Sequence, residues 1–338
     1  MRRAALLFLL SLFAAQPALA QAQSAPLQML EQRLAATAAE NPGEYGIAAL
    51  DLATGDVVSV NGNTPFPMAS TVKVAVAATY LSQVDAGRRS LDDQVGGVSA
   101  ATLMNAMLTR SDNHATDQLL AMLGGPATVN LWLHNHNLHG IRVDRTIAQL
   151  LADRRDLRDP RDSSTPLAML RLLQLIDSGE ALSPESHDRL LEIMSRCVTG
   201  RNRIRALLPP GTRVEHKTGT LNGYTGDVAY VTLPDQRRIA MVIFARGGDN
   251  RPAVIATAAR AIYDGFNAET GTAGTALASL MQDSDQDEGL SNVRGAMPAT
   301  SRDYRAPPAG GSAGAAFAPH YSGGRANAAS PLPPEPQK

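Results

Sequence analysis

The residues with the clearest chemical potential are a serine and a lysine three positions apart, Ser70 and Lys73. On a helix this spacing places both side chains on one face, one turn apart, so the hydroxyl and the amine can meet. A desolvated lysine can give up its proton and act as a base toward a serine hydroxyl. At a helix start, the backbone N–H of Ser70 would also lie where negative charge develops during attack on a carbonyl.

The use of lysine strengthens this interpretation. Lysine and arginine together number 31, but only Lys73, Lys217 and Lys338 are lysine. Arginine stays protonated at any working pH, whereas lysine does not. An S-x-x-K pattern is expected by chance about once in a chain of this length, so the pattern alone is weak. In a chain that otherwise uses arginine, lysine at positions 73 and 217 favours a chemical role that requires loss of a proton.

A second cluster, Ser111-Asp112-Asn113, carries a hydroxyl and an amide. A hydroxyl near the nucleophile can relay a proton to a leaving group, and the Asn113 amide can hold both a substrate carbonyl and a lysine. A Ser-Asp-Asn cluster in front of a helix is also typical of a helix N-cap, so both interpretations stay open.

The third cluster is Lys217-Thr218-Gly219-Thr220, at the end of a predicted strand. Strand alternation puts Lys217 and Gly219 on one face and Thr218 and Thr220 on the other. Gly219 would let a substrate backbone lie alongside the strand. The backbone N–H of Thr220 is a candidate second donor, beside that of Ser70, for an oxyanion.

The elements that must position these clusters follow from hydrophobic periodicity. The patterns predict strands at 46–52, 57–60, 213–218, 226–233 and 238–245, and helices at 27–39, 72–84, 101–108, 114–123, 127–135, 166–178, 186–195 and 252–266. Strands thus lie toward both ends of the folded part, with a long helical block between them. We predict an α/β (α+β) domain whose sheet is built from residues 45–60 and 213–245.

Composition divides the chain into three parts. Residues 1–20, with Arg2 and Arg3 before a short apolar run and an A-x-A site ending at Ala20, are typical of a secretory signal peptide, which predicts a secreted, periplasmic protein with no stable membrane anchor. Residues 21–268 form one domain of ordinary size. In 269–338, 38 of 70 residues are Ala, Gly, Pro or Ser, which predicts a disordered tail.

Charge and cysteine content exclude some classes of function. The net charge of −1, without a basic block, argues against a nucleic-acid partner. With Cys197 as the only cysteine, no intramolecular disulfide can form, and we expect this residue to pack as a small apolar side chain. We expect a monomer that needs no cofactor.

In this order, the S-x-x-K, S-D-N and K-T-G elements resemble those of class A β-lactamases and penicillin-binding proteins. The likeness extends over most of 65–266, including 66–70, 161–166 and 199–206. It implies a mixed, mainly antiparallel sheet with helices on both faces, beside an all-helical lobe at about 66–195. The resemblance implies Ser70 as the acylated nucleophile, Lys73 as base and Ser111 as proton relay, with Lys217 completing the catalytic set. It implies substrate contacts from Asn113, Thr218, Gly219, Thr220 and Arg203, and an oxyanion hole from the N–H groups of Ser70 and Thr220.

The chain departs from class A members in two ways. Their R-x-E-x-x-L-N motif supplies a glutamate that activates the deacylating water, but here Ile147 stands at the acid position and Leu151 at the amide position. General-base assistance is worth about 10²–10⁴ in rate, so we expect acylation to survive and deacylation to slow unless Asp153, Asp156 or Asp159 substitutes. In addition, only 41 residues separate Ser70 from Ser111, which predicts a more open cleft.

Other functions remain open at this stage. The same site would suit a penicillin-binding D,D-peptidase or an esterase acting on a small-molecule or peptidoglycan-like substrate, or a domain that only binds a cell-wall ligand. His134, His136 and His139 have the spacing of an H-x-H-x-D-H zinc motif, but Leu138 stands at the aspartate position. Capping or surface histidines are the ordinary explanation, so we predict no metal.

Overall fold

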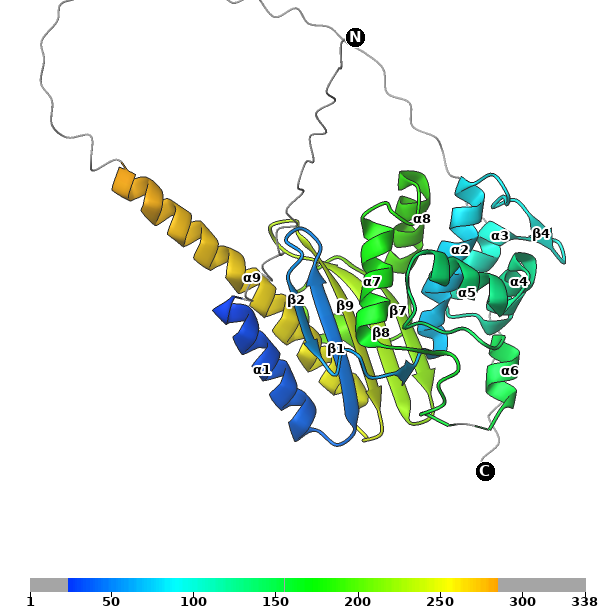
Figure 1. Cartoon of the computed structure of the whole chain (residues 1–338), viewed down its shortest axis with the longest axis horizontal. Coiled ribbons are helices and arrows are strands. Elements are labelled where there is room, and N and C mark those ends of the chain that lie inside the picture. The colour runs from blue at the N-terminus through cyan, green and yellow to red at the C-terminus, as the bar shows by residue number, and fades with distance from the viewer. Residues whose placement is uncertain (1–23, 155, 285–338) are drawn as a thin grey trace, which may run out of the picture. The chain divides into compact units, whose positions relative to one another are not determined.

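The structure, a computed structural model, describes residues 24–154 and 156–284. Its centre is a five-stranded antiparallel sheet in the order β2-β1-β9-β8-β7 (Figure 1). The strands are β1 (Glu44–Asp51), β2 (Val57–Val60), β7 (Val214–Leu221), β8 (Tyr224–Thr232) and β9 (Arg238–Arg246). The first and last parts of the domain meet where β1 pairs with β9, so the predicted sheet from both ends of the chain is confirmed.

Both faces of this sheet are buried. Along β1, Ile47 packs into one hydrophobic core and its neighbour Ala48 into the other. Ile243 and Phe244 divide in the same way on β9, because successive side chains of a strand point to opposite faces. The strands therefore read as nearly continuous apolar runs, as expected for a sheet covered on both sides.

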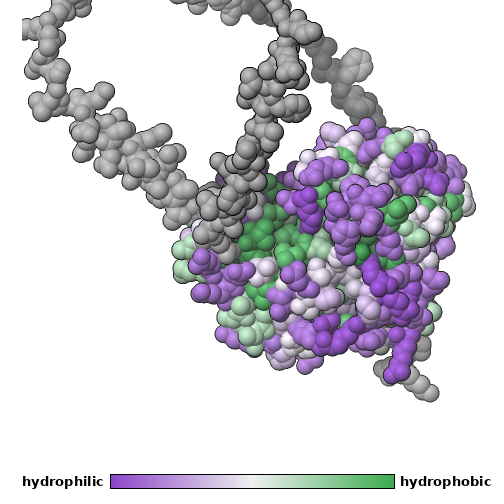
Figure 2. All heavy atoms as spheres, in the orientation of Figure 1, coloured by the Kyte–Doolittle hydropathy of each residue, from purple (hydrophilic) through white to green (hydrophobic). Residues whose placement is uncertain are grey.

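Two groups of helices supply the cover. Helices α1 (Ala25–Glu40) and α9 (Arg251–Ser284) pack together on one face (Figure 1). On the other face α7 (Pro166–Asp177) packs on β1 and β9, and α8 (Pro184–Ser195) packs on β7. The remaining helices of the helical lobe are α2 (Lys73–Asp85), α3 (Ala100–Thr109), α4 (Asn113–Leu123), α5 (Pro126–Asn135) and α6 (Ile147–Ala152). Hydrophilic residues predominate over this lobe on the face shown in Figure 2, as expected for helices that bury one stripe.

The remaining elements that the structure describes are short. Strand β3 (Phe66–Pro67) pairs with β6 (Ser163–Ser164), and β4 (Gln94–Val95) pairs with β5 (Val98–Ser99). Two 3₁₀ helices complete the described elements, η1 (Ala69–Val72) and η2 (Ile204–Leu207). The sequence patterns did not predict these short elements or α6, because two to six residues are too few to show a period.

Helix α9 is longer than the sequence predicted. It continues past residue 268, where the composition changes, and ends at Ser284. Alanine has the highest helix propensity, so an alanine-rich segment can prolong a helix that the domain has already nucleated. The predicted signal peptide and the remainder of the predicted tail lie outside the described residues. Among the helices that the structure describes, none has the length and apolarity needed to cross a membrane.

A network of charged side chains holds much of the segment from Asp144 to Asp162. Arg145, whose side chain is only 10% exposed, donates to Asp162 at 2.6 Å and to Asp153 at 2.7 Å, and lies 3.3 Å from Asp159. The Asp162 carboxylate also accepts the backbone N–H groups of Asp144 and Arg145. One arginine therefore fixes three carboxylates of the segment.

Replacing this arginine tests that arrangement. Arg145→Met should lower the free energy of unfolding at neutral pH by about 1–3 kcal/mol, because it leaves the buried Asp162 carboxylate without its cation. Arg158→Met is the matched control, since Arg158 pairs with Glu44 at the surface and its side chain is 68% exposed. Urea unfolding measures both variants, and equal stability of the two would contradict this account.

Candidate active site

Ser70 lies in η1, which directly precedes α2, and follows a residue with a strained backbone. Ala69 has a φ of 47°, in the left-handed region that side chains rarely adopt. The N–H of Met68 donates to the carbonyl of Asp162 at 3.0 Å, so the charged segment described above holds this turn from one side.

Strand β7 holds the same turn from the other side, through Gly219. A Cβ added to Gly219 would lie 2.6 Å from the carbonyl oxygen of Met68 and 3.2 Å from the Cβ of Ala69. From the sequence, we predicted that this glycine lets a substrate backbone lie alongside the strand. In the structure, its missing side chain makes room for the protein's own backbone next to Ser70.

Lys73 is the first residue of α2, and its side chain is fully buried. Its Nζ donates to the carbonyl oxygen of Ser111 at 2.7 Å and to Oδ1 of Asn113 at 2.8 Å, and lies 3.2 Å from Oγ of Ser111. Within the described residues no hydrogen bond joins Lys73 Nζ to Ser70 Oγ. The ammonium is instead bonded by oxygen atoms of the S-D-N cluster.

The S-D-N cluster combines the two functions that the sequence left open. Asp112 is the N-cap of α4 and accepts the N–H of Ala115 at 2.8 Å. Ser111, with a φ of 60°, and Asn113 turn toward Lys73 instead. The cap therefore fixes the start of the helix, and its two neighbours contact the buried amine.

Lys217 brings a second ammonium to the same hydroxyl. Its fully buried Nζ donates to Ser111 Oγ at 3.0 Å and to the carbonyl of Thr218 at 2.8 Å. The Ser111 hydroxyl thus lies between Lys73 and Lys217. Three of the four predicted catalytic residues are joined by hydrogen bonds, and the fourth, Ser70, lines the same hollow as Ser111.

Burial changes the acidity of both lysines. It lowers the pKa of Lys73 to about 7, and the nearby charge of Lys217 acts in the same direction while Asp112 and Asp117 oppose it. Burial also lowers the pKa of Lys217 to about 8, assisted by Arg203 and opposed by Cys197 and Asp227. Near neutral pH, Lys73 is therefore partly a neutral amine.

These groups adjoin a hollow of about 250 Å³ at the β7 edge of the sheet. It is lined by Ser70, Ser111, Asn113, Thr199, Arg203, Thr218 and Thr220. All except Thr199 were predicted. Thr199 lies in the 199–206 stretch noted from the sequence, but a lone threonine carries no chemical signal there. Its Oγ1 lies 2.6 Å from that of Thr218.

Arg203 forms part of the floor of this hollow. Its guanidinium donates to the carbonyls of Gly219 at 3.0 Å and Gly226 at 2.8 Å, and to Oγ1 of Thr220 at 2.6 Å. The arginine therefore ties the end of β7 to β8 and places positive charge next to the threonine hydroxyls.

No carboxylate is among the residues that line the hollow. Ile147, at the position of the missing glutamate, is buried in the hydrophobic core, and Leu151 is 52% exposed. Asp153 and Asp159 pair with Arg145 and Arg161.

Asp156, the third aspartate considered as a substitute, does not line the hollow either; it accepts the N–H of Arg158. The sequence did not anticipate Asp117, whose carboxylate accepts the N–H groups of Ile147 at 2.7 Å and Ala148 at 2.9 Å and so anchors the start of α6.

The three histidines considered for zinc do not converge. His136 stacks on Trp132 and its Nδ1 lies 2.7 Å from the carbonyl of Trp132, whereas the rings of His134 and His139 contact each other edge to face. The part of the chain that the structure describes contains no group of three or more histidine, cysteine or acidic residues arranged to hold a metal ion.

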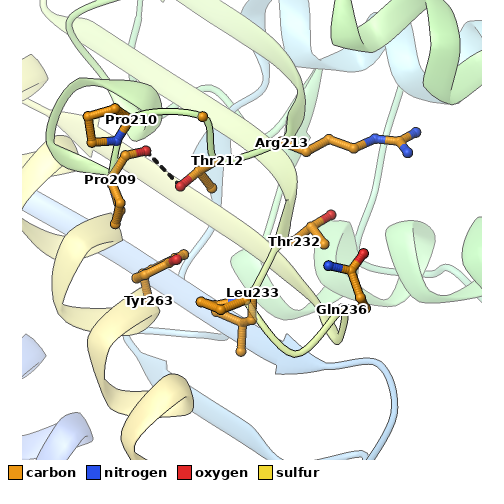
Figure 3. Close-up of a pocket in the computed structure, with 10 residues that line it drawn as sticks. Pro209, Pro210, Thr212, Arg213, Thr232, Leu233, Gln236 and Tyr263 are labelled. Carbon is orange, nitrogen blue, oxygen red and sulfur yellow. Dashed lines mark hydrogen bonds between the residues drawn. The ribbon is translucent and has the colours of Figure 1, made fainter.

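A hollow elsewhere lacks comparable chemistry. Figure 3 shows a cavity of about 360 Å³ near the start of β7, where the turn at Pro209 is closed by a 2.8 Å hydrogen bond from Thr212. Tyr263 of α9 and Arg213 also line it. None of the predicted site residues is among its lining residues.

Comparison with known proteins agrees with the fold. A model of the beta-lactamase enzyme family matches residues 29–266. Beta-lactamase CTX-M-8 of Citrobacter amalonaticus is 30% identical over 271 residues, which cover 72% of this chain and 92% of that protein. The solved structure of a variant of the class A beta-lactamase last common ancestor of Gram-negative bacteria has a TM-score of 0.67 at 34% identity, covering 70% of this chain and 98% of that one. A beta-lactamase of Chitinophaga pinensis has a TM-score of 0.66 at 31% identity, covering 71% of this chain and 100% of that one.

The fold is that of the class A beta-lactamases, a group of serine hydrolases. The chain belongs to the beta-lactamase enzyme family. The predicted fold class and the predicted superfamily are confirmed.

The two low lysine pKa values are directly measurable because the chain has so few lysines. In protein made with isotope-labelled lysine, NMR should show one side chain titrating at about pH 7 and another at about pH 8. Individual Lys→Arg variants at 73, 217 and 338 assign the signals. Ordinary values near 10.5 for both buried lysines would contradict the desolvation argument.

Proposed function

We propose that this chain is an exported serine hydrolase that works through an acyl-enzyme at Ser70, with a β-lactam amide as candidate substrate and slow deacylation. The observation that carries the proposal is the sharing of one hydroxyl, that of Ser111, between two buried lysines beside Ser70. Export is supported by the pattern of residues 1–20, which lie outside the described part of the chain.

Acylation would use the groups in a fixed order. The neutral amine of Lys73 takes the proton of Ser70 Oγ after its side chain leaves the S-D-N oxygens, and Oγ attacks the carbonyl carbon. Backbone N–H groups of Ser70 and Thr220 would stabilise the negative oxygen of the tetrahedral intermediate. The Ser111 hydroxyl relays a proton to the leaving nitrogen, and the C–N bond breaks to leave an ester on Ser70.

The far wall of the hollow suits an anionic substrate. Thr218 and Thr220 present hydroxyls there, and Arg203 and Lys217 lie beside them with positive charge. Charged donors of this kind bind a carboxylate more strongly than neutral ones do. Asn113 lines the opposite side, where its amide can contact a substrate carbonyl.

Deacylation lacks an evident base. No carboxylate lines the hollow, and the aspartates considered as substitutes form contacts with arginines. An ester on Ser70 would therefore be hydrolysed slowly. The same observation favours a second candidate function, a D,D-peptidase or esterase in which lysine manages both half-reactions.

Intact mass spectrometry after mixing with a penicillin separates the two half-reactions. We expect an adduct of one penicillin mass on the protein that persists well beyond the mixing time, because water has no general base. Ser70→Ala should form none. Rapid disappearance of the adduct would refute slow deacylation, and an inert Ser70 would leave only the function of a binding domain.

The acylation rate should follow the protonation of both lysines. Since Lys73 acts as a neutral amine, the rate should rise with pH up to about 7 and level off, then fall above about 8 as Lys217 loses its charge. Lys73→Arg should acylate about 10²–10⁴ times more slowly, because arginine keeps its proton. Stopped-flow fluorescence with a labelled penicillin measures the profile, and a flat profile from pH 5 to 9 would exclude Lys73 as the base.

A further inference from the structure

A second buried cluster of ionisable groups lies next to the hollow. Cys197, His216 and Asp227 are all almost completely buried. Nδ1 of His216 lies 3.1 Å from Oδ1 of Asp227, across β7 and β8. Thr218 on β7 is the cross-strand partner of Asp227 on β8, and His216 lies two residues before Thr218. The side chains of His216, Thr218 and Asp227 therefore lie on the same face of the sheet. The mechanism proposed above uses none of the three.

The cluster is connected to the wall of the hollow by two hydroxyls. Sγ of Cys197 lies 3.3 Å from Oγ1 of Thr199, which in turn lies 2.6 Å from Oγ1 of Thr218. In each contact either atom can be the donor. A hydroxyl donates only one hydrogen, so when Thr199 donates to sulfur, Thr218 must be the donor in the second bond, and when Cys197 is the donor, Thr199 is free to donate to Thr218.

Surrounding charges favour an ionised thiol. Although burial favours neutral imidazole, the carboxylate of Asp227 raises the pKa of His216 to about 9, and Cys197 acts in the same direction. Burial opposes ionisation of Cys197 as well, but the charged His216 lowers the pKa of that thiol to about 7, with contributions from Thr199 and Lys217. Cys197 is buried, as expected for a small side chain, but some of its neighbours are polar or charged.

Other charged groups face the cluster from neighbouring elements. Arg203 interacts with both Asp227 and Cys197, and Lys217 on β7 interacts with the same two residues. Tyr224 on β8 stays protonated, since burial raises its pKa far above the usual range. Of these groups, Lys217 also becomes partly neutral by pH 7.8, so the effect of Cys197 is isolated by comparison with a variant that lacks only the thiol.

We propose that Cys197, bonded to Thr199 and influenced by the charge of the buried His216–Asp227 pair, is a positioning residue that decides whether Thr218 offers a donor or an acceptor to the substrate. As a thiol, Cys197 donates to Thr199, Thr199 donates to Thr218, and the Thr218 hydrogen is free to point into the hollow. As a thiolate it can only accept, so Thr199 donates to sulfur and Thr218 donates to Thr199. Thr218 then presents lone pairs, which repel a carboxylate.

The first experiment needs no substrate. Thiolate absorbs in the far ultraviolet where a thiol does not, and Cys197 is the only cysteine of the chain. The difference spectrum between the full chain and its Cys197→Ser variant should therefore show one titration centred near pH 7. A midpoint at pH 9 or above, the range of an unassisted buried thiol, would overturn the proposal.

The second experiment rests on the proposed function and uses acylation by a penicillin and by its uncharged methyl ester. Serine in place of Cys197 keeps a hydroxyl but does not ionise. The quantity compared is the acylation rate of Cys197→Ser divided by that of the unchanged protein, with the penicillin as substrate. This ratio should be roughly 3- to 10-fold larger at pH 7.8 than at pH 6, which corresponds to the free energy of one hydrogen bond. The methyl ester should show no such change with pH. The ionisation of Lys73 affects the rates of the variant and of the unchanged protein alike, because both contain this lysine, so its effect cancels in the ratio of the two rates.

Controls separate positioning from a structural role. Val198→Thr alters the neighbouring residue, which is 54% exposed and outside the cluster, and should behave as the unchanged protein. If Cys197→Ser folds poorly, Cys197→Ala gives the same comparison. An equal change for both substrates, or at both pH values, would refute the proposal. If no adduct forms on the unchanged protein, the proposed function fails, and the thiol titration alone decides whether the charged cluster exists.

Discussion

Two ammonium groups share one hydroxyl in the interior of this protein, and the rest of the site is arranged around that interaction. Removing two like charges from water is unfavourable, so burial lowers the pKa of each lysine, and each ammonium is bonded to oxygen atoms. Ser111 supplies two of those partners from a left-handed backbone, its carbonyl and its hydroxyl. The strain at this residue is thus tied to a function, as is common for such outliers.

The same requirement explains the position of β7. As the edge strand of the sheet it has a free side on which helical segments can approach, and Gly219 allows the approach at its closest point, next to Met68. Arg203 then closes the end of the strand by binding the carbonyls of two adjacent strands. A sheet with both faces buried provides a rigid base for these contacts, because a one-residue slip would exchange its two cores.

Charge also controls the segment that would carry the catalytic acid in class A relatives. Here Arg145 and Asp117 fix it, the first through carboxylates and the second through the N–H groups that start α6. Ile147 faces the core from this helix rather than the hollow. Under the proposed function, the groups that would form an ester line or adjoin the hollow, while no carboxylate lines it to direct water to that ester.

Local sequence was sufficient for much of this protein. Apolar periodicity located the five strands of the sheet and most helices, and the three motifs located Ser70, Lys73, Ser111 and Lys217, because spacing along a helix or strand fixes which side chains share a face. The absence of the glutamate could also be recognised from the sequence, because it depends only on which residue stands at position 147. Short elements such as η1 and α6 could not, because they are set by neighbours.

Only the tertiary structure decided which groups touch. It gave Lys73 hydrogen-bond partners in Ser111 and Asn113, placed the backbone of Met68 against Gly219, and put Cys197 near charged groups. Each of these contacts joins residues far apart in the chain, and its geometry depends on how strands and helices pack. Burial, which sets the lysine and thiol pKa values, is a property of the whole fold and leaves no local trace in the sequence.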